Sequence, residues 1–85
     1  MDEIEKIMKK HKMNEDRMIL GAYTNHYTRE AADGGEYVAF FGKGTITVRY
    51  DGKGDDYTIL ARIPTDMNCA TTLDNLLKTL SFKEA

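Results

Sequence analysis

Apolar positions near the start of the chain recur with the period of an α-helix. Ile4, Ile7, Met8 and His11 stand at i, i+3, i+4 and i+7, which places them on one helical face. Acidic residues precede this stripe and lysines follow it, as the positive and negative ends of a helix dipole favour. The pattern predicts an amphipathic helix over residues 1–13.

Residues 18–29 fit two structures. Apolar residues recur at helical spacing, but Gly21 interrupts them, and the stretch is rich in tyrosine and threonine, which are enriched in strands. We favour a strand. The alternative, a helix, would leave a two-stranded hairpin under three helices. Asp33, Gly34 and Gly35 predict a turn in either case, because glycine reaches positive φ at little cost.

Alternation of apolar and polar residues is clearest in the stretch that follows. Its even-numbered positions are Val38, Phe40, Gly42, Gly44, Ile46, Val48 and Tyr50. Because alternate side chains of a strand point to opposite faces, this unbroken phase favours one long strand, bent at the two glycines, with its even residues inward. The alternative is two shorter strands that turn at Gly42 and Lys43.

The segment after Tyr50 predicts a hairpin. Residues 51–56 are rich in aspartate and glycine, and Pro64 ends the strand that follows. The expected inward row of this strand is Tyr57, Ile59, Ala61 and Ile63. Placing Tyr57 opposite Tyr50 also opposes the other members of the two inward rows, which predicts an antiparallel pair.

A leucine stripe marks a last helix, over residues 71–81. Its members are Leu73, Leu76, Leu77 and Leu80. Thr71 or Thr72 suits the N-cap, and Asp74 three residues after Thr71 completes an imperfect capping box.

Together these elements predict an α+β fold in the order α-β-β-β-α. An N-terminal helix (1–13) and a C-terminal helix (71–81) cover one face of a three-stranded antiparallel sheet (17–64), which makes a two-layer sandwich. The 85 residues are expected to form a single domain, 1–85.

Composition narrows the function classes. Twelve basic against 14 acidic residues give a net charge of −2, which disfavours sequence-independent binding to phosphate backbones. One cysteine, Cys69, excludes an internal disulfide and fits a reducing compartment. The longest apolar run, residues 37–41, is too short to span a membrane, and the acidic start does not resemble a secretory leader. We therefore expect a cytoplasmic protein with no membrane partner.

Phosphate and calcium motifs are absent at the places that most resemble them. The run from Gly42 to Thr45 lacks the earlier glycine and the following helix of a P-loop. The aspartates of residues 51–56 lack the alternate spacing and terminal glutamate of an EF-hand. A backbone bend and a solvated hairpin tip explain these two segments.

Metal and catalytic groups are sparse. His11, His26 and Cys69 are too scattered in sequence to predict a zinc site, and Cys69 fits a semi-buried packing residue. The one acid–base pairing worth considering is His26 with Asp66 or Glu30, but so small a domain leaves little room for a substrate pocket. We expect no metal, no cofactor and no catalytic residue.

The second face of the predicted sheet offers the candidate binding site. If both helices cover the even face, aromatic and apolar residues remain exposed beside two arginines, a composition typical of protein interfaces. The candidate partner-binding residues are Tyr37, Phe41, Arg49, Leu60 and Arg62. The alternative is that a helix or a second copy covers them as ordinary core.

These observations favour a small, non-catalytic protein–protein interaction module. By analogy of size and architecture, such domains are typical of phage or mobile-element inhibitors that bind and block a host enzyme, for example one of defence or nucleic-acid processing, in the host cytoplasm.

Two alternatives from other classes stay open. One is a single-stranded nucleic-acid-binding sheet, although residues 36–42 lack the basic, glycine-interleaved motif of that class. The other is a self-assembling structural protein that buries Tyr37 and Phe41 in a homodimer.

Overall fold

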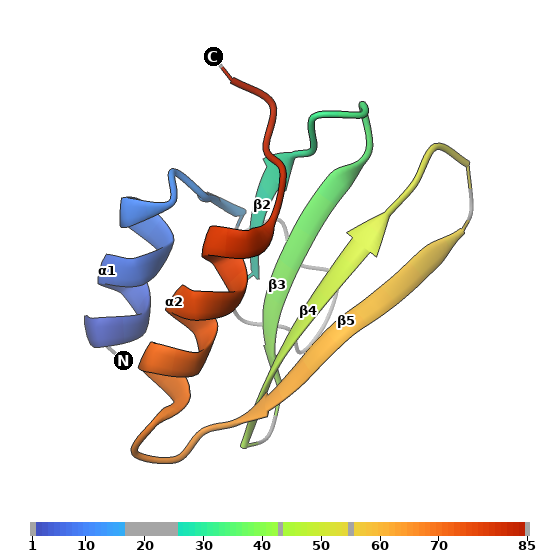
Figure 1. The fold of residues 1–85 in the computed structure, drawn as a ribbon. Helices are drawn as coiled ribbons and strands as arrows, with labels where there is room; N and C mark the ends of the chain where they lie inside the picture. The colour runs from blue at the N-terminus through green and yellow to red at the C-terminus, as the bar shows by residue number, and fades with distance from the viewer. Residues whose placement is uncertain (1, 17–25, 43, 55, 85) are drawn as a thin grey trace.

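The chain folds into two helices on one face of an antiparallel sheet (Figure 1). The computed structural model describes residues 2–16, 26–42, 44–54 and 56–84. Its elements are helix α1 (Asp2–Lys10), strands β1 (Asn14–Asp16), β2 (His26–Glu30), β3 (Glu36–Gly42), β4 (Thr45–Asp51) and β5 (Tyr57–Pro64), and helix α2 (Cys69–Thr79). The predicted α+β class is confirmed. The sheet has five strands in the order β1-β2-β3-β4-β5, however, and not the expected three.

Both predicted helices are present with shifted ends. α1 ends at Lys10 because the chain turns at Lys12, whose φ is 57°, and the Met13 N–H donates to the Met8 carbonyl. This bond belongs to a Schellman ending, which seats both methionines in the core. α2 starts at Cys69, two residues before the predicted threonine caps, with Asn68 at the N-cap position.

The single long strand predicted between Val38 and Tyr50 is wrong. The chain reverses after Gly42, which pairs with Thr45, and Gly44 adopts the positive φ of 71° that this turn requires. The pattern misled because an odd-numbered residue of β3 pairs with an even-numbered residue of β4, so that the inward face changes parity at the turn.

The β4–β5 hairpin is antiparallel as predicted, but its register differs. Asp51, not Tyr50, lies opposite Tyr57, and a β-bulge follows between Val48 and Arg49. Leu60 is the extra residue of this bulge. Beyond it, Ala61 and Ile63 lie opposite Val48 and Ile46 on the helix-covered face, whereas Tyr57 and Ile59 turn to the face that Arg49 occupies.

The first part of the predicted sheet is confirmed where the structure describes it. Residues 26–30 form a strand, β2, and residues 18–25 of the expected strand lie outside the described residues. The short strand β1 was not predicted. It pairs with β2 and forms one edge of the sheet.

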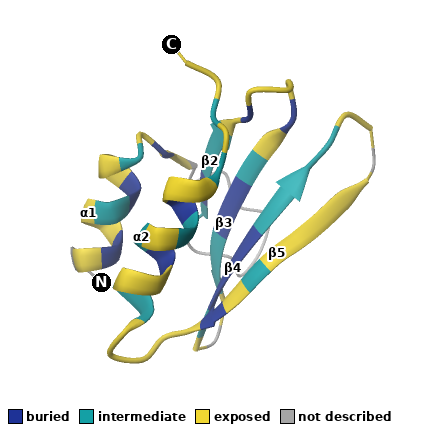
Figure 2. Cartoon of the chain, viewed as in Figure 1, coloured by how far each residue is buried: buried dark blue, intermediate teal, exposed yellow. Residues whose placement is uncertain are grey.

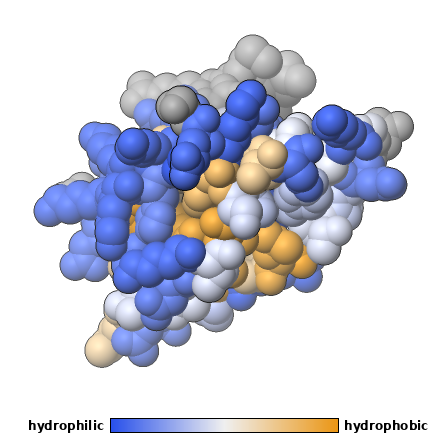
Figure 3. Space-filling model, turned by 45° about the horizontal axis from the view of Figure 1, so that its top comes forward, coloured by the Kyte–Doolittle hydropathy of each residue, from blue (hydrophilic) through white to orange (hydrophobic). Residues whose placement is uncertain are grey.

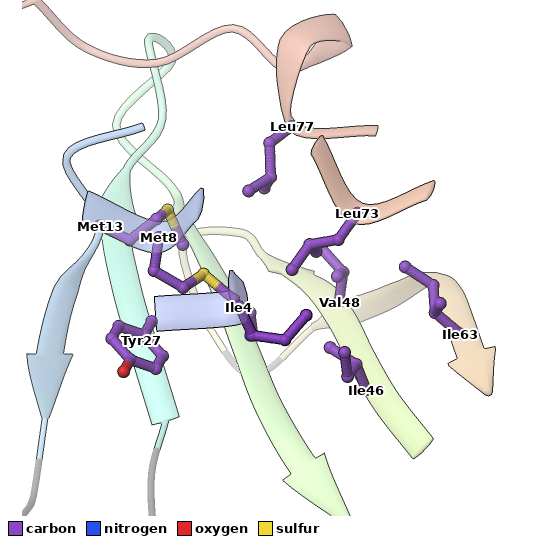
Figure 4. Packing of buried hydrophobic residues seen from close by; sticks show 10 residues of the cluster. Ile4, Met8, Met13, Tyr27, Ile46, Val48, Ile63, Leu73 and Leu77 are labelled. Carbon is purple, nitrogen blue, oxygen red and sulfur yellow. The ribbon is translucent and has the colours of Figure 1, made fainter. Parts of the chain in front are cut away.

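The core lies between the two helices and the central strands (Figure 4). Ile4 and Met8 from α1 and Leu73 and Leu77 from α2 point toward the sheet. The buried cluster is completed by Met13, Tyr27, Ala39, Ile46, Val48 and Ile63. Burial falls off toward β5, most of which is exposed (Figure 2).

Candidate protein-binding edge

The five sequence-predicted site residues do not share one surface. Tyr37 and Phe41 lie on the helix-covered face, because the turn after Gly42 reverses the expected parity of β3. The Tyr37 ring packs on Tyr50 and Phe82, with centroid separations of 5.4 and 5.3 Å, and the Phe41 ring contacts Tyr27 at 6.0 Å. The expectation that Tyr37 and Phe41 form an exposed face with the arginines is therefore wrong.

Arg49 and Arg62 do lie together on the face away from the helices. Arg62 pairs across the strands with Thr47, which neighbours Arg49 along β4. The Arg49 guanidinium lies 5.6 Å from the centre of the Phe40 ring and 5.2 Å from that of Tyr57. Two aromatic rings thus hold this side chain by cation–π contacts.

An acidic neighbour compensates the charge of Arg49. Its Nε lies 2.7 Å from Oδ1 of Asp51 on the same strand, and a terminal guanidinium nitrogen donates to Oδ2 at 3.0 Å. Asp51 thus pairs with Arg49. Arg62, the other arginine of this face, forms no ion pair among the described residues.

Among the described residues, β5 carries most of the exposed large apolar side chains. Tyr57 is 61% exposed, Ile59 37% and Leu60 39%; among the described residues, Met67 is the one other large apolar side chain of this kind. Within the described part of the chain β5 pairs only with β4, so its far side presents unpaired backbone N–H and C=O groups. Leu60 is the one sequence-predicted apolar residue that belongs to this edge.

Tyr57 and Ile59 were missed because the sequence pattern placed them in the inward row. The bulge moves them outward. A signal for this bulge exists in the sequence, because Ile59, Leu60 and Ala61 are three consecutive apolar residues that interrupt the alternation of the strand.

The opposite edge of the sheet is protected. β1 has only three residues, all polar, and two of them are acidic. Beyond β1, the C-terminal segment covers β2: Phe82 bridges to Ala31, and the Lys83 N–H donates to the Glu30 carbonyl at 3.0 Å. Short length, charge and a covering segment are the usual means by which proteins block edge-to-edge pairing.

Polar contacts join α2 to α1 on the flank of α2 that carries Asp74. The Asp74 carboxylate lies 2.7 Å from the His11 imidazole, 3.2 Å from the Lys10 ammonium and 3.3 Å from that of Lys78. On the other flank of α2, Leu76 and Leu80 are only partly buried. In the view of Figure 3, apolar side chains reach the surface of the molecule between hydrophilic ones.

Because of these contacts, we expect the stability of the fold to depend on pH in the acid range. The His11 hydrogen bond, helped by Lys10 and Lys78, holds the pKa of Asp74 far below its ordinary 3.8, against the opposing effect of burial. A carboxyl whose pKa is lower in the folded state stabilises the fold above pH 3.8 and loses this effect as the pH falls.

We therefore expect Asp74→Asn to lower the melting temperature at neutral pH, and to do so less as the pH drops below 3.8. Thermal unfolding of the wild type and of Asp74→Asn, followed by circular dichroism from neutral pH downward, measures the difference between their melting temperatures. If this difference in melting temperature stays constant down to the lowest pH measured, the stabilising role assigned to the ionised Asp74 carboxylate is wrong.

An open cleft of 780 Å³ lies between α1, the β3–β4 turn and the start of α2. Its lining includes Ile4, Phe41, Ile46, Asp66 and Cys69. Cys69 is half-buried, as expected of a packing residue. Among the described lining residues no histidine, lysine or arginine stands beside this thiol to activate it.

The pairing of His26 with Glu30 that the sequence suggested is not assembled. His26 and Glu30 stand at opposite ends of β2, about 13 Å apart along the strand. Asp66 lines the cleft and accepts a hydrogen bond from the Asn68 N–H. In the described ranges, no three His, Cys, Asp or Glu side chains are placed to hold a metal ion.

No helix among the described residues is long and apolar enough to cross a lipid bilayer. Comparison with protein-family models, with curated proteins and with solved structures finds no match for this chain.

Proposed function

We propose that this protein is a small, non-catalytic protein-binding module that engages its partner through the free edge of β5. The observation that carries the proposal is the contrast between the two sheet edges. Three polar residues and a covering segment protect the β1 edge, whereas β5 offers eight residues, with Tyr57, Ile59 and Leu60 exposed. An extended segment of a partner that adds to such an edge gains backbone hydrogen bonds and apolar contacts together.

The inhibitor role fits this mode of binding. A phage- or mobile-element-encoded protein of this kind would block a host enzyme by covering a strand or loop that the enzyme needs. Arg62 on the outer face of β5 supplies a cation for an acidic group next to that segment.

Nucleic-acid binding by the same surface is the second candidate. Phe40 and Tyr57 flank Arg49, and aromatic rings beside a cation can stack bases. It ranks second because Asp51 compensates Arg49 and the chain carries a net charge of −2.

The test is a tagged capture from the source or host lysate, with and without nuclease, using three baits. The wild type is compared with Ile59→Lys, which places a charge on the edge, and with Met67→Lys, which places the same charge at an exposed apolar residue outside β5. We expect the wild type to capture a protein that stays bound after nuclease treatment. The Met67→Lys bait should capture the same protein, and the Ile59→Lys bait should not. The captured protein, once purified, should bind Ile59→Lys at least about tenfold more weakly than the wild type in calorimetry.

Two outcomes would overturn the proposal. Equal capture by all three baits would show that the edge of β5 does not contact the partner. Loss of every captured molecule after nuclease treatment, with binding that weakens steeply as salt rises, would move nucleic acid to first place.

A further inference from the structure

The free edge of β5 is chemically complementary to itself. Arg62 is its one charged residue, and no charged residue, glycine or proline interrupts the stretch from Tyr57 to Ala61. A second copy of the same edge would therefore bring no block of like charges against it, in contrast to the β1 edge, where acidic residues would repel one another.

The face assignments of β5 restrict how two copies can align. Tyr57 and Arg62 lie on the face away from the helices, because Tyr57 stacks on Arg49 and Arg62 pairs with Thr47. Thr58 and Ala61 lie on the helix-covered face, opposite Tyr50 and Val48. Cross-strand neighbours must share a face. Since the bulge adds one residue to β5, a pair that joins residues from opposite sides of the bulge shares a face only when an odd-numbered residue of one copy meets an even-numbered residue of the other.

One antiparallel register satisfies the condition for the pairs on either side of the bulge, and it also pairs the side chains favourably. It sets Tyr57 of each copy opposite Arg62 of the other, and Thr58 opposite Ala61. Ile59 then meets Leu60 beside the two-fold axis, so that the extra residue of each bulge lies at the centre of the interface. The contacts are two arginine–aromatic pairs at the ends and a central apolar group.

We propose that the protein forms a symmetric dimer in which β5 pairs with β5 of a second copy and joins the two five-stranded sheets into one. The inference rests on the proposed function in that both assign binding to the same edge. The dimer adds regulation: it covers Tyr57, Ile59 and Leu60 until the other protein displaces the second copy. Because the interface is small, the dimer is weak, with a dissociation constant of about 1–100 µM.

Sedimentation equilibrium of the full chain, from about 1 µM to about 1 mM, tests the dimer directly, since this range brackets the expected dissociation constant. The wild type should pass from monomer to dimer, and Met67→Lys should behave in the same way. Ile59→Lys and Leu60→Glu should each raise the dissociation constant at least about tenfold, because each buries a charge without a partner. Far-ultraviolet circular dichroism checks that the variants are folded.

A mixture of the two charged variants tests the register. Ile59 of one copy lies opposite Leu60 of the other, so Ile59→Lys and Leu60→Glu should associate with each other more tightly than either does with itself. A wild type that stays monomeric, a dimer that Met67→Lys weakens as much as Ile59→Lys does, or a mixture with no gain would each overturn the proposal.

These outcomes separate the two proposals. A monomeric wild type whose captured protein is still lost with Ile59→Lys refutes the dimer and leaves the proposed function standing. If Ile59→Lys disrupts the dimer but still captures the protein, the dimer stands and the proposed function is refuted.

Discussion

Replacement of Leu73 by alanine is expected to lower the free energy of unfolding by about 3 kcal/mol. Leu73 is fully buried and is among the largest such side chains of the core, where it fills the space between α2 and the sheet. Its truncation removes apolar contacts and leaves a cavity that the surrounding helix and strands can fill only in part. For a domain of this size, such a loss is a large fraction of the total stability.

Urea unfolding of the variant, followed by circular dichroism, measures this loss. Leu76→Ala on the same helix is the matched control, because Leu76 is only partly buried and its truncation should cost clearly less. Equal losses at the two positions would show that α2 does not use the face that the structure assigns to the core.

Replacement of Gly35 by alanine is expected to cost about 2–3 kcal/mol, the upper part of the range for overpacked sites. A Cβ at this buried position would lie 2.6 Å from the Tyr50 hydroxyl and 2.7 Å from the Asp51 carbonyl oxygen. The tyrosine can move, but the carbonyl belongs to β4, which pairs here with β3. The β2–β3 turn must therefore open or the strand must shift.

Gly42→Ala is the matched control, since its nearest neighbour would be 3.9 Å from the new Cβ. We expect its stability to stay within about 0.5 kcal/mol of the wild type, as at other unstrained sites.

The Gly35→Ala variant has a second readout in the Tyr50 hydroxyl. This group donates a hydrogen bond to Asp33, which raises the pKa of Tyr50 above 10.0 and lowers that of Asp33. Displacement of the ring should return the pKa of Tyr50 toward 10.0, measured by ultraviolet titration. An unshifted titration together with unchanged stability would contradict the close approach.

The sequence predicts the elements whose signal is local. The period of Ile4, Ile7 and Met8 identifies α1, and the leucine stripe identifies α2, because each helix has one apolar face against the core. The ends of these helices are less predictable. α1 ends at a left-handed lysine, and α2 begins without a side-chain cap.

The turn and the bulge account for the errors in the sheet. Gly42 and Gly44 share the parity of the apolar residues around them, so the alternation continues through a turn that reverses the chain. The bulge at Leu60 changes which residues of β5 face outward. Both are one- or two-residue events whose effect reaches every side chain beyond them, because the period of a strand is two.

The candidate site was predictable only in part for the same reason. Arg49, Leu60 and Arg62 were identified as candidate partner-binding residues, and the structure places them on or beside β5. Tyr37 and Phe41 were assigned to the same face, although they lie on the opposite one, where they contact Phe82 and Tyr27. The free edge itself has no local signature, because it depends on which strand comes last in the sheet.

The strand order has a consequence for how the chain folds. Every strand pairs with the strand next to it in sequence, so the sheet can assemble as a series of local hairpins. The contacts of Lys10 and His11 with Asp74, by contrast, span 64 and 63 residues and carry a larger entropy cost of closure. α2 also follows the whole sheet in the chain. The strands are therefore synthesised before α2, and the part of the core face that α2 covers stays open until this helix docks.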